Sequence, residues 1–298
     1  MRNPLPVRRG SARGGRAREQ SDAARPRVGD VVVAPLSDLH PTQSTLGFDE
    51  ICSKLGRYTL GKNAPEAKGR SDPRTRTKTA VIGPGSQLYL TDGHHTFTTL
   101  AEMADGGPDA RVKLRLVADL SDATPDVFWA TMRRHGWTHL KDAEGRTIAP
   151  ADLPASLALA DFGDDELRSL LYFARGIGYR STDVPFQEFH WAEWLRTETD
   201  IDLRIRHEHD AYLDLVERVT RAQASLRPDA RISGDLTAAD LGALPRWNDG
   251  AAKGEGAFGR LSAPYESPRP GRLAYALEFR QLHGIHPAHR GPEHAHRS

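Results

Sequence analysis

Two adjacent histidines follow a glycine where a predicted strand meets a predicted helix, in the segment Asp92-Gly93-His94-His95-Thr96. Backbone N–H groups are unpaired at the start of a helix and, together with the helix dipole, they favour an anion there. Gly93 lets the backbone approach a ligand closely, and histidines supply hydrogen-bond donors or general acid–base groups. We expect His94 and His95 to have different roles, because adjacent side chains diverge at a helix start. The alternative is that Asp92 is only an N-cap and that both histidines pack locally.

Glu50 and Lys54 form a second candidate pair, four residues apart on a predicted helix and therefore on one face. In the functional interpretation Glu50 is a general base and Lys54 stabilises the charge on a phosphoryl oxygen. In the simpler interpretation they form a surface salt bridge worth about 0.3–0.5 kcal/mol. The spacing alone is compatible with both.

Three further polar residues are candidates for ligand binding. Thr42 and Gln43 follow Pro41 at the predicted end of the first strand region, where small-molecule sites gather, although turn chemistry also explains Gln43. Arg168 is a candidate cation for a phosphate group, and a local ion pair with Asp164, one helical turn earlier, is the alternative.

The elements that must position these residues alternate between strands and helices. In order along the chain come a β-branched run, a helix with Ile51, Leu55 and Tyr58 on one stripe, a hairpin around Gly-Pro-Gly-Ser and a helix stopped by Gly106. The predicted strands are 31–33, 79–82, 87–90 and 112–116, and the predicted helices are 48–58 and about 94–104. This order predicts a small α+β domain within about 90 residues.

Beyond residue 120 the pattern becomes helical. Thr124 and Pro125 predict a cap and a first helical position, and Asp164 is the predicted cap of a later helix. We therefore divide the chain into four parts. These are a disordered basic tail (1–27), the α+β core (28–120), a helical extension packed on it (121–245) and a partly disordered Gly/Pro/His-rich tail (246–298).

Composition excludes several classes of protein. The single cysteine, Cys52, rules out an intramolecular disulfide and a zinc site of several thiolates. There is no apolar run long enough to span a membrane and no apolar leader near the start, so a cytoplasmic protein is expected. Residues 1–27 carry eight arginines and two acidic residues, whereas the remainder has a net charge of −5. Nucleic acid is therefore expected to be attracted mainly by the tail.

Several blocks of the chain resemble one known family. His40-Pro41-Thr42-Gln43, with Gly47, Glu50 and Lys54, resembles the Pro-Thr-Gln…Gly…Glu…Lys block of the Putative ParB-like nuclease family, and Asp92-Gly93-His94-His95 resembles its Asp-x-His-His motif. Further similar blocks are Phe128-Trp129, Leu153-Pro154, Arg168-Ser169-Leu170 and the segment 186–192. The resemblance spans roughly residues 30–196. It implies a ParB/sulfiredoxin-like mixed-sheet domain, followed here by a mainly helical region.

The chain also differs from the related proteins at several positions. Sulfiredoxins have a reactive cysteine where this chain has His94, so sulfinic-acid reduction is not expected. Partition proteins and ParB-like serine kinases follow the turn with an arginine that contacts phosphate, and Thr96 stands there instead. A phosphate clamp must then come from Lys54, Lys78 or Arg168. The helix-turn-helix domain of partition proteins is not evident, whereas the serine kinases' early glutamate favours a catalytic Glu50.

These features predict an enzyme that acts on a phosphate-containing or nucleotide ligand, as a phosphotransferase or phosphohydrolase, with a nuclease as a special case. Mg²⁺ is an expected cofactor, bridging phosphates through Asp92 or Glu50, and no protein metal site is expected, even from the late histidines. The alternatives are a nucleotide- or DNA-binding switch without turnover and a small-molecule enzyme of specialised metabolism. Substrate identity and oligomeric state stay open.

Overall fold

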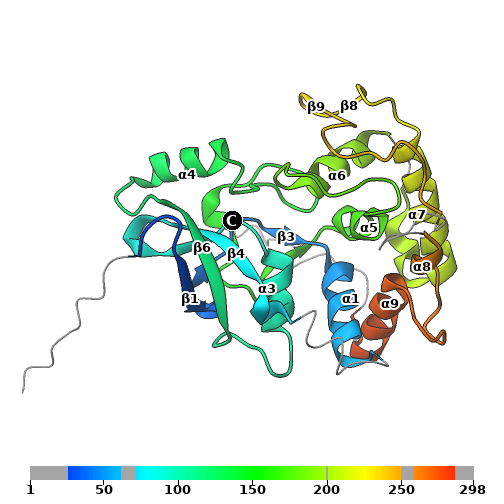
Figure 1. Ribbon diagram of the computed structural model, residues 1–298, viewed down its shortest axis with the longest axis horizontal. Helices are drawn as coiled ribbons and strands as arrows, with labels where there is room; N and C mark the ends of the chain where they lie inside the picture. Colours follow the sequence, from blue (N-terminus) through cyan, green and yellow to red (C-terminus); the bar gives the residue numbers. More distant parts are fainter. Residues whose placement is uncertain (1–25, 62–71, 199–200, 250–257, 286–298) are drawn as a thin grey trace, which may run out of the picture.

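The strands between residues 31 and 119 form a five-stranded mixed sheet (Figure 1). The structure is a computed structural model that describes residues 26–61, 72–198, 201–249 and 258–285, so nearly all of the predicted basic tail lies outside the described residues. The strand order is β1-β6-β4-β5-β2. The strands are β1 (Val31–Pro35), β2 (Leu39–His40), β4 (Thr77–Ile82), β5 (Leu88–Leu90) and β6 (Arg111–Asp119).

Antiparallel and parallel pairs alternate across this sheet. β1 runs antiparallel to β6, β6 parallel to β4, β4 antiparallel to β5, and β5 parallel to β2. The predicted hairpin at 79–90 is the β4–β5 pair. Strand β2 was not predicted, because a two-residue strand within 36–43 has the composition of a turn.

Two helices cover one face of the sheet and a third covers the other. α1 (Phe48–Thr59) and α3 (His94–Ala101) pack into the main core, which includes Ala80 and Leu114. α4 (Pro125–Arg134) packs on Val81 through Phe128 and Met132. Ala80 and Val81 are neighbours on one strand, so their side chains point to opposite faces. The α+β core is thus a sheet between two layers of helix.

The helical extension continues from this core. Its helices after α4 are α5 (Glu166–Ala174), α6 (Gln187–Glu198) and α7 (His209–Ala224), and α8 (Phe258–Leu261) and α9 (Arg272–His283) follow in the segment 246–298. Short strand pairs are β3 (Thr45–Leu46) with β7 (Gly163–Asp164) and β8 (Arg231–Ser233) with β9 (Leu236–Thr237). Single 3-10 turns lie at Leu36–Asp38, Pro73–Thr75, Pro84–Ser86, Pro150–Asp152, Leu159–Asp161 and Leu203–His207.

The extension is attached to the core where α1 begins. The β3–β7 pair brings α5 beside α1, and Gly47 is so close to α5 that an added Cβ would lie 2.9 Å from the backbone nitrogen of Ser169. Asp165, not the predicted Asp164, caps α5 through a hydrogen bond from the backbone N–H of Arg168. Asp164 instead accepts the backbone N–H of Phe48 and so caps α1.

Helix α9 was not predicted, because its segment was expected to be a partly disordered tail. It packs side by side with α1 (Figure 1), and Phe279 and Ala276 join the main core. An added Cβ on Gly56 would lie 2.5 Å from the backbone oxygen of Tyr275, so the two helices are in direct backbone contact. Within the segment 246–298, which was expected to be a partly disordered tail, residues 272–283 thus form a helix packed on α1.

A buried ionic cluster joins α1 to the later helices. Asp49, which is fully buried, accepts hydrogen bonds from Arg206, Arg280 and the hydroxyl of Tyr212. Arg206 also contacts Asp164 at 3.1 Å and Glu166 at 2.8 Å. Burial opposes the ionised form of Asp49, yet the two arginines hold its pKa below the ordinary value. The cluster fixes the first turn of α1, where Glu50 is the next residue.

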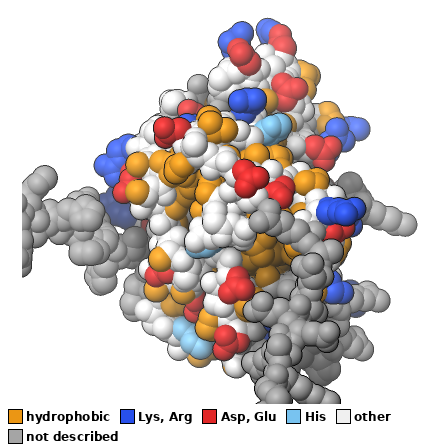
Figure 2. Space-filling model, turned by 90° about the vertical axis from the view of Figure 1, so that its left-hand side faces the viewer, with side chains coloured by type: hydrophobic (Ala, Val, Ile, Leu, Met, Phe, Trp, Pro, Cys, Tyr) orange, Lys and Arg blue, Asp and Glu red, His pale blue; other side chains and the backbone are white. Residues whose placement is uncertain are grey.

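Among the described residues, the surface over the sheet side shows no large patch of one charge in Figure 2. Acidic and basic side chains are interspersed there among apolar ones (Figure 2). None of the helices in the described part of the chain has both the length and the apolar character needed to cross a membrane.

Candidate functional site

A cavity of about 640 Å³ opens between the α3 start, α1, α5 and the segment before α6. All the predicted site residues line it except Thr42: Gln43, Glu50, Lys54, Asp92, Gly93, His94, His95, Thr96 and Arg168. Residues far apart in the sequence therefore converge on one space, and residues of the resemblance blocks 40–54, 92–95 and 186–192 meet there.

His94 connects the start of α3 to the segment after β2. Its Nε2 accepts a hydrogen bond from the backbone N–H of Thr42 at 3.0 Å, and only 2% of the residue is exposed. Burial lowers its pKa to about 3. His94 is therefore neutral with its proton on Nδ1, because an acceptor nitrogen cannot also carry the proton.

His95 makes the corresponding bond to the start of α1. The backbone N–H of Gly47 donates to Nε2 of His95 at 3.0 Å. Burial holds its pKa well below the ordinary value, against the opposing effect of Glu50. His95 is therefore also neutral, and its Nδ1–H is a donor without a partner among the described residues. The two histidines contact different segments, as their divergence at the helix start predicts.

Glu50 lies at the centre of the charged groups. Lys54 Nζ is 2.8 Å from one carboxylate oxygen, and Arg168 Nη2 is 2.8 Å from the other. Burial alone would raise the pKa of Glu50, but Lys54 and Arg168 hold it well below its usual range. The Glu50–Lys54 pair predicted from the spacing is present, and Arg168 pairs with Glu50 instead of Asp164.

A second carboxylate extends this cluster toward α6. Glu188 contacts Arg175 and lies 3.9 Å from Arg168, and the two arginines lower its pKa against the effect of burial. Arg168 is 4% exposed, yet its Nη1 has no hydrogen-bond partner among the described residues. Buried donors of this kind are rare in native proteins and call for an explanation.

Gly93 and Lys78 form the other wall of the cavity. Gly93 has φ +96°, and an added Cβ would lie 2.6 Å from Cγ of Lys78. Glycine is thus needed both for the backbone conformation and for the passage of the lysine stem. Lys78 Nζ reaches Asp92 at 2.8 Å. Gly93, and not Asp92, occupies the N-cap position of α3, so the interpretation of Asp92 as a simple cap is wrong.

Thr42 and Gln43 differ in their placement. Thr42 is fully buried outside the cavity, and its hydroxyl donates to the backbone oxygen of Leu90 at 2.6 Å. Gln43 lines the cavity, but its side-chain amide donates to the backbone oxygen of Thr45 at 2.7 Å. These bonds make Thr42 a support for His94, and they support turn chemistry for Gln43.

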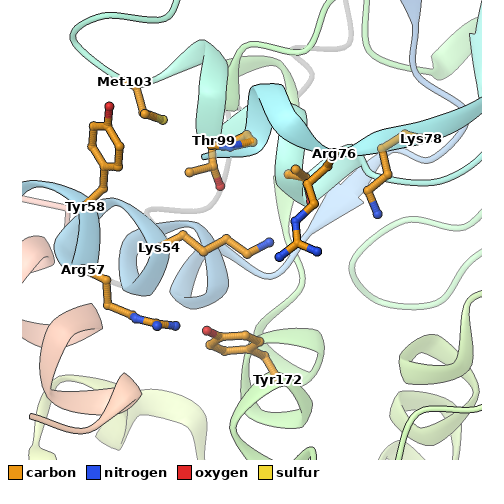
Figure 3. A pocket seen from close by; sticks show the side chains of 10 residues that line it. Lys54, Arg57, Tyr58, Arg76, Lys78, Thr99, Met103 and Tyr172 are labelled. Carbon is orange, nitrogen blue, oxygen red and sulfur yellow. The ribbon is translucent and has the colours of Figure 1, made fainter. Parts of the chain in front are cut away.

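A smaller cavity of about 300 Å³ adjoins the first and is strongly basic (Figure 3). Lys54, Lys78 and Thr96 line both cavities, and Arg57 and Arg76 line only the smaller one of the two. Figure 3 shows Lys54 extending from α1 toward Arg76, with the ring of Tyr172 below them. No aspartate or glutamate belongs to the described lining of this smaller cavity.

The described residues do not fit a preformed metal site. Nowhere in the described part of the chain do three His, Cys, Asp or Glu side chains come together to hold an ion. Glu50 is already enclosed by Lys54 and Arg168, which leaves Asp92 as the predicted Mg²⁺ contact with an exposed side chain. Burial raises the pKa of Cys52 to about 12, so this thiol is not poised for redox chemistry.

Sequence reasoning missed several residues of the site. Arg175 and Glu188 form their pair across 13 positions, and Tyr172 lines both cavities. Glu188 stands inside the resemblance block 186–192, which was its only signal in the sequence. Arg175 and Tyr172 have no such signal, because their roles depend on how α5 faces α1.

Comparisons with known proteins agree with this architecture. The family model described as "Putative ParB-like nuclease" matches residues 32–197. A solved structure, protein Atu1540 from Agrobacterium tumefaciens, is 27% identical with a TM-score of 0.54, over 70% of this chain and 98% of that chain. No curated protein matches the chain. The matched region runs from within β1 to within α6 and contains every predicted site residue, and the chain belongs to the Putative ParB-like nuclease family.

Proposed function

We propose that the protein is an enzyme that acts on a phosphate-containing ligand, as a phosphohydrolase or phosphotransferase. The observation that carries the proposal is the buried Arg168, whose Nη1 lacks a partner in the described structure while the residue lines the cavity beside Lys54. A buried donor without a partner costs about 1–3 kcal/mol. A phosphate oxygen would satisfy it if the guanidinium turned toward the cavity, and arginine suits such oxygens through its planar fork of donors.

The phosphate group lies, in this proposal, where the two cavities meet. Lys54, Lys78 and Thr96 line both of them, and Thr96 belongs to the first turn of α3. Unpaired N–H groups of that turn and the two lysines would neutralise the phosphate charge. His95 would donate its Nδ1–H to a phosphoryl oxygen as a neutral group and would not transfer a proton.

Glu50 is the proposed proton acceptor. It is ionised in the free protein, because nearby cations hold its pKa well below the ordinary value. A bound phosphate would add negative charge beside it and raise its pKa toward the range of a useful base. Water or a substrate hydroxyl then attacks phosphorus and gives its proton to Glu50. The P–O bond to the ester oxygen breaks, and the leaving oxygen keeps the electron pair and takes up a proton from Glu50 or from water. Mg²⁺ enters the proposal only as an ion that the ligand's phosphates bring with them.

The same site supports a second candidate, a nucleotide-binding switch without turnover. Both histidines accept backbone hydrogen bonds and are neutral, and burial lowers their pKa. Glu50 and Glu188 also have lowered pKa values. Efficient acid–base catalysts have pKa values near the working pH, so this pattern favours binding as much as chemistry.

Turnover and binding, measured together, separate these candidates. Wild type, Glu50→Gln and the control Glu278→Gln would be tested with ATP, p-nitrophenyl phosphate and bis(p-nitrophenyl) phosphate, with and without Mg²⁺. Glu278 lies on α9 and lines none of the cavities described here. We expect Glu50→Gln to lose turnover by about 100-fold or more, the usual effect of a general base, while it still binds ligand.

Three outcomes decide the proposal. Turnover that Glu50→Gln abolishes and Glu278→Gln preserves supports the enzyme. Wild-type binding without any turnover supports the switch. Neither binding nor turnover by a folded wild type contradicts both and favours a small-molecule enzyme with another substrate. Thermal unfolding of each variant is recorded in parallel, and Glu50→Asp serves as a second variant if Glu50→Gln does not fold.

A further inference from the structure

A third cavity of about 950 Å³ continues the site along the surface, and we call it the arginine groove. It is lined by six arginines: Arg57, Arg175, Arg180, Arg260, Arg269 and Arg272. No aspartate or glutamate belongs to its described lining. These arginines come from α1, the end of α5 and the segment 176–181, and the segment 259–272 before and at the start of α9.

The arginine groove is continuous with the proposed phosphate site. Tyr172 lines all three cavities, Arg57 lines the smaller cavity and the groove, and Arg175 lines the larger cavity and the groove. In Figure 3 Arg57 extends from α1 toward Tyr172, at the edge of the space that Lys54 enters. A charged ligand can therefore pass from Lys54 into the groove without leaving a basic surface.

Several of these guanidinium groups are free to bind. Arg57, Arg180, Arg260 and Arg269 are exposed, and their guanidinium groups make no hydrogen bond or ion pair with a described residue. Arg272, in contrast, is held in place by contacts within the protein. Arg272 donates to backbone oxygens of Phe173 and Arg175 and stacks on Tyr172 at 4.9 Å. Exposed arginines gathered in a concave surface, without carboxylates, focus a positive field.

We propose that the arginine groove binds the phosphodiester backbone of a single-stranded nucleic acid, whose reacting phosphate lies beside Lys54. This inference rests on the proposed function and names its substrate class. Three connected cavities exceed the space of one mononucleotide, and successive arginines suit the repeated phosphates of a strand. A single strand can thread a phosphate into the cavity, whereas the phosphates of a duplex lie on the outside of a wide, stiff helix. The −5 net charge outside the basic tail hides this local concentration of arginine.

The test is binding of fluorescent single strands of about 16 nucleotides, the upper end of single-strand site sizes, as a function of salt. Arg180→Gln/Arg269→Gln removes two groove charges, and Arg218→Gln/Arg246→Gln removes two exposed arginines that line no cavity described here. Each phosphate contact on a single strand contributes about −0.7 to the slope of log K against log salt. We expect the groove pair to flatten the slope by about 1.4 and the control pair to leave it unchanged.

Each contrary result overturns the inference. If the wild type binds the single strand no more tightly than it binds ATP, the strand does not use the groove. If the groove pair and the control pair lose equal affinity for the strand, the loss reflects net charge alone. A matched duplex that binds as tightly as the single strand contradicts the assignment to a strand. Turnover of small phosphate esters by the wild type separates the two proposals, because a protein that hydrolyses them but ignores the strand loses only the groove.

Discussion

The backbone nitrogen of Gly47 lies 3.0 Å from Nε2 of His95, and this single hydrogen bond joins the start of α1 to the start of α3. It fixes the imidazole in the form with a proton on Nδ1, because Nε2 is the acceptor. It also holds the first turn of α1, and therefore Glu50, beside α3. His94 does the same for the segment after β2 through Thr42. The histidine pair thus sets the geometry of the cavity before any ligand arrives.

The protonation state of His94 predicts a dependence of stability on pH. Its folded-state pKa is about 3, against 6.5 for the ordinary group. Between these values the unfolded chain binds a proton that the folded chain does not, so stability falls as the pH falls below 6.5. The contribution is about 1.4 kcal/mol per pH unit. His94→Gln, which keeps an acceptor near Nε2, should lose this contribution.

Urea unfolding of wild type and His94→Gln at pH 7 and pH 5 measures this contribution. Between the two pH values, the free energy of unfolding of wild type should fall by about 2 kcal/mol more than that of His94→Gln. His207→Gln, at an exposed position, is the control and should behave as wild type. If wild type and His94→Gln lose stability equally between the two pH values, His94 is not buried in its neutral form.

Gly93→Ala tests the passage of Lys78 over the α3 start. Gly93 and Gly107 have nearly the same backbone conformation, with φ +96° and +93°, but only Gly93 has neighbours that an added Cβ would meet. Both substitutions should cost about 1–2 kcal/mol for the left-handed conformation. Gly93→Ala should in addition displace Lys78 and weaken ligand binding.

Thermal unfolding and nucleotide binding of the two alanine variants check this expectation. Gly107→Ala should bind nucleotide as wild type does. Equal stability and equal binding in both variants would show that the contact between Gly93 and Lys78 has no role in the site.

The ionic cluster around Asp49 predicts a large effect on stability. Asp49→Asn would leave Arg206 and Arg280 without their shared carboxylate in a buried setting, which typically costs about 3–5 kcal/mol. Asp214→Asn, an exposed change on α7, should leave stability unchanged. The free energy of unfolding of the two variants decides the point, and similar small losses in both would mean that the cluster contributes little.

Local sequence patterns predicted most helices and strands of the α+β core, but they could not predict contacts between residues far apart in the sequence. The hairpin signal in Gly83-Pro84-Gly85-Ser86 and the stripe on α1 depend on neighbouring residues, and the structure has both elements. The Glu50–Lys54 pair follows from helical spacing. In contrast, Arg168 reaches Glu50 across 118 positions, and no local rule distinguishes that pairing from one with Asp164.

Helix α9 could not be predicted from its local sequence either, because it depends on packing against another helix. Its segment follows a stretch rich in glycine and proline, which was interpreted as the start of a partly disordered tail. Its helical structure depends on contact with α1, including the backbone approach at Gly56. Tertiary packing, which supplies most of the stability of helices in proteins, therefore decided an element that local composition did not predict.

Lys54 is the residue whose removal tests the phosphate site most directly, because it lines both cavities and is partly exposed. The measurement is the equilibrium binding of ATP to wild type, Lys54→Gln and Lys113→Gln, where Lys113 is an exposed residue of β6 that lines none of the cavities. A charge-assisted hydrogen bond is worth about 1.5–3 kcal/mol, which corresponds to about 10- to 150-fold in affinity. We predict a loss of this size in Lys54→Gln and none in Lys113→Gln. Equal binding by all three proteins, each folded as well as wild type, would contradict the account.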